Sequence, residues 1–237
     1  MKKIYFLILI GALSFGSCDN DDGIIEEDDQ NLCNDEITDF GTIYLSPEST
    51  DYIPYNGVEN IYFKNVNGEE VKFKPLSPPI SHFFMETEFE LICENGDFNN
   101  YVFTREQYAV AHRCEDLNLQ YYLNIYSYHS SQHPEFVDIF SLTFHEPALD
   151  NYIDTSINLA IITSFRNNEE LLTEEFANYS NYEFVSEINL LNKTFNEVYK
   201  VNEPEDNLLT ELYFNKEYGI IGFKDLDLEL WVFDRIE

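Results

Sequence analysis

The sequence predicts a mainly β domain, either an antiparallel sandwich or a strongly curved half-barrel, with one or two short helices. From residue 39 onward the chain is a succession of short segments rich in Tyr, Phe, Ile, Val and Thr, the residue types that strands favour. Turn residues separate these segments at regular intervals. Only two short segments carry a helical pattern, so helices contribute little to the predicted architecture.

The first predicted hairpin turns at Asn67-Gly68. Residues 60–66 and 69–74 on either side are strand-like segments with alternating character. Asn-Gly between two such segments favours a hairpin, because both residues tolerate the positive φ angles of a tight turn. A further strand is predicted over residues 83–93, before the next group of turn residues.

The middle of the chain contains the clearest alternating segment, residues 117–128. Its apolar residues fall on one face and its amides and several tyrosines on the other, which is typical of a half-buried antiparallel strand. Two more strands are predicted over 136–144 and 157–165. Short helices are predicted over 168–178 and, on a weaker pattern, over 105–112.

The carboxyl-terminal third is predicted to be a meander of antiparallel strands with tight turns at Asn192 and at residues 216–219. Strands joined by such short turns pair as neighbours. They are expected over residues 182–191, 193–201, 208–215, 220–224 and 228–234.

The amino terminus has the three parts of a secretion signal. Lys2 and Lys3 form a basic start, residues 4–13 are apolar, and small residues precede Cys18. The apolar part is only about half of the roughly 20 residues that a membrane-spanning helix needs. The run Leu13-Ser14-Phe15-Gly16-Ser17-Cys18 resembles the lipobox of bacterial lipoproteins, although Phe15 stands where that family prefers Leu, Val or Ile. The resemblance implies a signal peptide over 1–17 and a diacylglycerol on Cys18.

An acidic segment follows Cys18, with Asp and Glu concentrated in residues 19–22 and 26–29. It resembles the export signal of Bacteroidota outer-membrane lipoproteins, which implies a protein exposed on the cell surface, with the periplasmic leaflet as the alternative. Its composition predicts a flexible tether over residues 18–38, because like charges repel and little apolar surface is available. The β-rich domain is then expected over residues 39–237.

The end of the chain carries a second resemblance. Residues 211–225 and 229–231 are similar to the closing hairpin of uncharacterised Bacteroidota lipoproteins, with an aromatic pair, a polar turn ending in Gly219 and a last strand containing Trp231. The similarity supports the lipoprotein class and implies no active site.

Charge restricts the partners. The chain has 45 acidic and 13 basic side chains and a formal net charge of −32. Nucleic acid is excluded as a partner, because phosphate binding needs positive charge. Attachment to the outer membrane is expected to come from the acyl chains rather than from adsorption on anionic lipid. No cofactor is expected.

Three cysteines follow Cys18, namely Cys33, Cys93 and Cys114. An exported protein meets an oxidising environment, so one disulfide with one cysteine left over is expected. Cys93–Cys114 is the favoured pair because each residue lies at the edge of a strand-like segment, while Cys33 lies close to the tether. The other two pairings remain open, and the spacing does not predict a metal site.

The histidines do not predict a metal site either. His129 and His133, with His145 further on, form the most metal-like group. Two histidines four residues apart share a face only on a helix, whereas this segment is predicted to be a loop that ends at Pro134. No catalytic residue is assigned.

The aromatic residues carry the functional prediction. Tyr122, Tyr126 and Tyr128 lie on the polar face of their predicted strand and are candidate ligand contacts, because aromatic rings with a polar end suit binding surfaces. The sequence thus favours a non-catalytic binding or assembly module of the outer membrane, with a glycan or an envelope protein as its partner. A glycan- or peptide-hydrolysing surface enzyme is the alternative, because so many acidic residues include carboxylate pairs at the spacing of about 5–10 Å that a glycosidase uses.

Overall fold

The computed structural model describes residues 37–76, 82–92, 98–129, 136–147, 157–165, 182–202 and 208–237. It confirms the mainly β prediction, with one curved sheet and one short helix in these ranges. No helix within them is long and apolar enough to cross a membrane. The elements are β1 Thr38–Ile43, α1 Pro47–Thr50, β2 Ile61–Lys64, β3 Glu70–Pro75, β4 His82–Ile92, β5 Phe98–Cys114, β6 Leu119–His129, β7 Phe136–His145, β8 Ile157–Phe165, β9 Tyr182–Leu190, β10 Lys193–Asn202, β11 Leu209–Asn215, β12 Gly219–Asp225 and β13 Leu230–Ile236.

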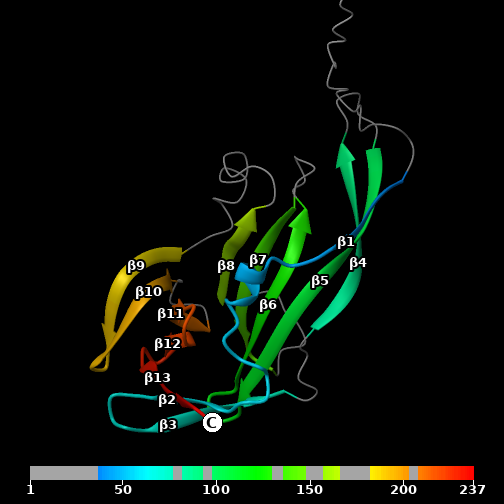
Figure 1. The fold of residues 1–237 in the computed structure, drawn as a ribbon. Coiled ribbons are helices and arrows are strands. Elements are labelled where there is room, and N and C mark those ends of the chain that lie inside the picture. The colour runs from blue at the N-terminus through cyan, green and yellow to red at the C-terminus, as the bar shows by residue number, and fades with distance from the viewer. Residues whose placement is uncertain are drawn as a thin grey trace, which may run out of the picture.

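The strands follow one hydrogen-bonded path, β8-β7-β6-β5-β3-β2-β13-β12-β11-β10-β9, and β1 and β4 pair with β5 beside it. The path is antiparallel throughout, whereas β1 is parallel to β5. The sheet curls round on itself so that β9 and β10 face β7 and β8 across the molecule (Figure 1). This is the curved half-barrel of the two predicted architectures.

Strand β5 belongs to two regions. Its carboxyl-terminal part, residues 107–114, pairs with β6, and near its end it also pairs with β3. Its amino-terminal part pairs with β4 on one side and with β1 on the other. We call β1, β4 and residues 98–106 of β5 the arm, and the remaining strands the half-barrel. Figure 1 shows the arm extending away from β9–β13.

Aromatic rings fill the half-barrel. Phe73 lies at the centre, with ring centroids of Tyr121, Phe63, Phe223 and Phe144 between 5.3 and 6.4 Å away. All five side chains are completely buried. Each comes from a different strand, so their packing joins β2, β3, β6, β7 and β12 around one core.

The segment before β2 closes one end of this core. The buried hydroxyl of Tyr55 donates to the Tyr218 carbonyl at 2.6 Å and accepts from the Ile220 amide at 3.0 Å. Gly219 lies between them with φ +76°, and a Cβ there would come within 2.2 Å of the Tyr55 hydroxyl oxygen. Position 219 therefore needs glycine both for its backbone conformation and for the close approach of Tyr55.

A buried carboxylate fixes α1 to the half-barrel. Asp138 on β7 is completely buried and accepts hydrogen bonds from the Ser46 amide at 2.7 Å and from the hydroxyls of Ser49 at 3.0 Å and Ser127 at 2.8 Å. These charge-assisted hydrogen bonds compensate for the loss of water around the carboxylate. They also determine where the chain runs after β1.

The predicted hairpin at Asn67-Gly68 is confirmed as β2–β3. Of the two turn residues only Gly68 has a positive φ, +81°. The side-chain oxygen of Asn65 accepts from the amides of Asn67 and Glu69, so this side chain organises the turn. The predicted meander is confirmed as β9–β13.

Two predictions need correction. Residues 105–112 are not a helix but part of β5, because β4 and β6 pair with this segment on opposite sides and such pairing overrides a weak local preference. The described residues also include β1, a strand that the alternation pattern did not predict. The helix predicted over 168–178, the signal peptide, Cys18, Cys33 and His133 lie outside the described residues.

The structure speaks against the Cys93–Cys114 disulfide. The Cys114 thiol is free and completely buried at the end of β5. Cys93 itself is not among the described residues, but its neighbour Ile92 pairs with Phe98 at the other end of this 17-residue strand. The two ends are on the order of 50 Å apart along an extended strand. A disulfide requires Cα atoms within about 7 Å.

Candidate functional site

The arm carries an aromatic cluster of its own. Phe89 on β4 stacks on Tyr101 of β5 with a centroid separation of 5.0 Å, and on His129 of β6 with a separation of 3.8 Å. Phe40 on β1 lies 5.5 Å from the Tyr101 ring and 5.3 Å from the ring of Phe136. The cluster therefore joins the arm to the ends of β6 and β7.

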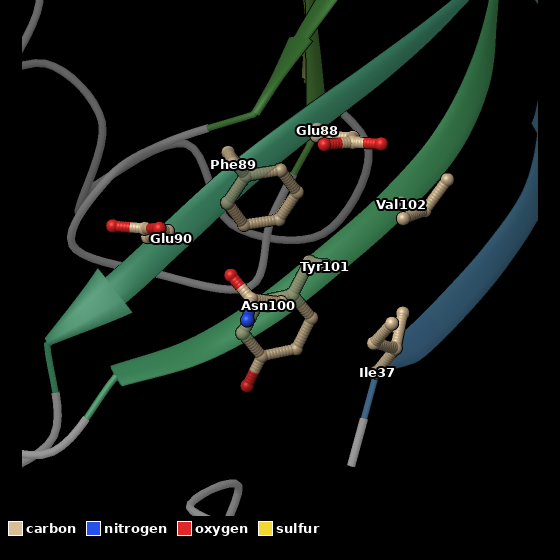
Figure 2. A pocket seen from close by; sticks show the side chains of 7 residues that line it. All are labelled: Ile37, Glu88, Phe89, Glu90, Asn100, Tyr101 and Val102. Carbon is tan, nitrogen blue, oxygen red and sulfur yellow. The ribbon is translucent and has the colours of Figure 1, made fainter. Parts of the chain in front are cut away.

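Two cavities lie against this cluster, and Glu88, Phe89 and Glu90 line both. The larger has a volume of about 540 Å³ and is drawn in Figure 2, where Phe89 and Tyr101 come from adjacent strands and Ile37 from the start of β1. Its remaining lining residues are Glu88, Glu90, Asn100 and Val102. The smaller, of about 230 Å³, is lined by Thr87, Glu88, Phe89, Glu90, Phe103, Arg105, Tyr128 and His129.

The larger cavity combines apolar and polar walls. Ile37, Phe89, Tyr101 and Val102 supply carbon surface, whereas Glu88, Glu90 and Asn100 supply carboxylate and amide groups. Tyr101 is almost completely buried, and burial raises the pKa of its hydroxyl, so it stays protonated at neutral pH. Apolar walls with a few polar groups are the usual composition of a small-molecule site.

Arg105 is the cationic residue of the smaller cavity. Its guanidinium carbon lies 4.9 Å from the centroid of the Tyr126 ring, a cation–π contact that orients the group. Burial lowers the pKa of Arg105, although an arginine remains charged in proteins. Its buried Nε has no hydrogen-bond acceptor within the part of the chain that the structure describes.

The three predicted contact tyrosines are all half-buried on the outer face of β6, and they divide between two places. Tyr128 lines the smaller cavity and Tyr126 supports Arg105 beside it. Tyr122 lies further along the strand, where it stacks on His145 at 5.1 Å and accepts a hydrogen bond from Gln120. Two of the three thus meet at one site, and their contact with a ligand stays a prediction.

The histidines occupy different surroundings from those predicted. His129 lies in β6 rather than in a loop and is buried among the rings of the arm. His145 ends β7, far along the sheet from His129. Among the described residues no group of three His, Cys, Asp or Glu side chains is arranged to hold a metal ion.

Comparison with known proteins adds no assignment. No protein-family model, curated protein or solved structure matches the chain. The case for a function therefore rests on the residues around the two cavities.

Local patterns did not reveal most of the site. Phe89 and Arg105 were part of a predicted strand and a predicted helix, and neither segment indicated that the two residues share a cavity. No signal in the sequence distinguished Arg105, because Arg166 and Arg235 also lie near aromatic residues. The pairing of β4 with β5 brings these residues together, and that pairing is not encoded in a short motif.

Proposed function

We propose that this chain is an outer-membrane lipoprotein, anchored through Cys18 and exposed on the cell surface, whose β domain acts as a non-catalytic binding module for a glycan. The observation that carries the proposal is the pair of adjoining cavities on the arm, which share Glu88, Phe89 and Glu90. Ile37, the first residue that the structure describes, lines the larger cavity.

The walls of the larger cavity match the chemistry of a sugar. A sugar ring has apolar C–H surfaces and a rim of hydroxyl groups. Aromatic and aliphatic side chains can contact the first, while Glu88, Glu90 and Asn100 can accept hydrogen bonds from the second. The negative charge of the chain does not oppose a neutral, hydroxyl-rich ligand, whereas it repels polyanions such as nucleic acid.

The proposal is tested by screening the full lipoprotein, purified in detergent, on an array of glycans. Glu88→Gln with Glu90→Gln is expected to weaken binding of any captured glycan at least tenfold, because amides are poorer acceptors for hydroxyl donors than carboxylates. Glu187→Gln on β9, also at an exposed position, is the matched control and should leave binding unchanged. Equal binding by all three proteins would place the ligand elsewhere.

The location is tested separately by treating intact and lysed cells with protease. Loss of the carboxyl-terminal strands from intact cells is expected for a surface protein. Protection until lysis would place the domain in the periplasm and make periplasmic glycans the ligands to screen.

A hydrolase is the second candidate, and one observation favours it. Glu88 and Glu90 are two residues apart on the same face of β4, which places their Cα atoms about 6–7 Å apart. Two carboxyl groups on neighbouring same-face positions can reach the separation of about 5–10 Å that glycosidases use. Both side chains are exposed, however, unlike the apolar enclosure that makes a carboxyl group a proton donor at neutral pH. Release of reducing ends from a bound glycan, abolished by either Glu→Gln change, would establish the hydrolase.

A further inference from the structure

Arg105 is half-buried and, unlike Arg235, has no anionic partner among the described residues, whereas Arg113 on the same strand is exposed to water. Arg235 on β13 contacts three carboxylates, those of Glu70 at 2.6 Å, Glu237 at 2.6 Å and Asp234 at 3.0 Å. In a chain with 45 acidic residues, such pairing is what chance and stability both favour. No ion pair joins Arg105 to a carboxylate anywhere in the described ranges, and its Nε is buried without an acceptor.

A half-buried guanidinium with an unmatched Nε lowers the free energy of unfolding unless another group compensates for its lost water. The cation–π contact with Tyr126 compensates only in part. Arg105 also lines a cavity of about 230 Å³. Because guanidinium groups bind carboxylates through two parallel hydrogen bonds, the arrangement is suited to an anionic group that enters the cavity from outside.

The sheet separates Arg105 from the acidic residues nearby. Met85 is opposite Arg105 in the β4–β5 register and Thr87 is opposite Phe103, and residues directly opposite each other share a face. Phe89 lies on this face too, whereas Glu88 and Glu90 alternate to the other one. The side chains of β4 and β5 next to Arg105 on its own face, Met85, Thr87 and Phe103, are therefore uncharged, and Glu88 and Glu90 reach the smaller cavity from the other face.

We propose that Arg105 binds the carboxylate of an acidic sugar residue, a uronate, within the glycan held by the arm. This inference rests on the proposed glycan-binding function and names the ligand class of the smaller cavity. A cavity of 230 Å³ has the volume of about seven water molecules, which suits one ring rather than a chain. A single guanidinium balances the one negative charge of a carboxylate, whereas a phosphate group brings nearly two.

The test compares binding of a trisaccharide that carries one galacturonate residue, and of its methyl ester, to the full chain by titration calorimetry. The natural protein is expected to bind the acid at least tenfold more tightly than the ester, which lacks the charge. Arg105→Gln should remove this preference. Arg105→Lys should restore only part of it, since an ammonium group cannot form the two parallel bonds. Arg113→Gln, at an exposed position of the same strand, should leave the preference intact.

Each result has a distinct meaning. Equal affinity for acid and ester in the natural protein, with both weakened by the Glu88→Gln and Glu90→Gln pair, would overturn the role of Arg105 and leave glycan binding in place. An acid preference that survives Arg105→Gln would overturn it as well. No binding of either compound, together with an array that captures no other glycan, would overturn both proposals. Circular dichroism of each variant confirms that a lost preference does not come from unfolding.

Discussion

The half-barrel and the arm both contain clusters of aromatic side chains. The two clusters differ in whether cavities lie against them. In the half-barrel, Phe73 and its neighbours are completely buried against one another. In the arm, Phe89, Tyr101 and Phe103 pack just as closely to one another but border two cavities. The difference shows that aromatic content alone does not distinguish a core from a binding site.

The two regions also differ in the hydrogen-bond partners of a charged side chain. The buried carboxylate of Asp138 in the half-barrel has three hydrogen-bond donors from neighbouring serines, so its charge serves the fold. The half-buried Arg105 of the arm has an aromatic support but no carboxylate partner in the described ranges. Among the described residues, buried polar atoms without a partner also occur in the half-barrel, at Tyr121 and His112, so the distinguishing feature of Arg105 is its uncompensated charge.

Gly219→Ala is expected to destabilise the half-barrel more than the other substitutions considered below. The added Cβ would displace the Tyr55 ring and disrupt its two buried hydrogen bonds, in addition to the strain of a positive φ. We expect the free energy of unfolding to fall by about 4 kcal/mol or more, measured by urea denaturation with the fluorescence of Trp231.

Gly68→Ala is the matched control for this change. Gly68 has a similar φ of +81°, but nothing lies within 4 Å of its Cβ position. It should cost about 1 kcal/mol, the cost of the conformation alone. Similar losses at the two positions would show that the contact with Tyr55 is unimportant.

A pair of identical substitutions compares the two regions directly. Phe73→Ala removes a ring from the closed core and is expected to cost about 3–5 kcal/mol. Phe89→Ala enlarges cavities that already exist, so we expect about 2 kcal/mol. Because Trp231 lies in the half-barrel, hydrogen exchange along β4 should accompany the fluorescence measurement. An equal or larger loss for Phe89→Ala would mean that the arm is a second core.

Acid should weaken the half-barrel through His112. Burial lowers the pKa of His112 from the usual 6.5 of a histidine to about 4, while the Glu59 carbonyl accepts from its Nε2. Below about pH 6.5 the unfolded chain takes up a proton that the folded chain excludes, so stability falls as pH decreases towards 4, by roughly 3 kcal/mol in total. Unfolding measured between pH 7 and 4.5 should lose part of this slope in His112→Gln. An unchanged slope would assign it to other groups.

The smallest effect is expected at Arg105. Replacement by Met keeps much of the packing and removes an unmatched charge, so the free energy of unfolding should change by less than about 1 kcal/mol. A loss above about 2 kcal/mol in urea denaturation would give Arg105 a structural role and weaken the comparison between the regions.

Much of the half-barrel could be predicted because its signals are local. Asn67-Gly68 determines a turn, and the alternation of residues 117–128 correctly places Leu119, Tyr121, Leu123 and Ile125 on the buried face. The turns of the carboxyl-terminal meander are equally short, so each strand pairs with its chain neighbour. The alternation of apolar and polar residues, together with the turn residues, is sufficient to predict such an arrangement of neighbouring strands.

The arm could not be predicted in the same way because its pairings are distant in sequence. Strand β1 pairs in parallel with a strand about sixty residues later, and its bulge near Gly41 interrupts any alternation. Residues 105–112 contain good helix formers and become a strand only between β4 and β6. The cavities depend on these contacts, which is why Tyr126 and Tyr128 were identified from the pattern of their own strand but Phe89 and Arg105 were not.

The parallel pairing of β1 with β5 has a mechanical consequence. Thr38 pairs near Tyr101 and Ile43 near Arg105, so the chain enters the arm at the end remote from the half-barrel and runs inward. A pull on the preceding segment would act along the strand axis and load the bonds between β1 and β5 in shear, all at once, rather than peel them apart one by one. A domain held by its amino terminus in flowing liquid would thus resist detachment of β1, and with it the loss of Ile37 from the wall of the larger cavity and of Phe40 from its contact with Tyr101.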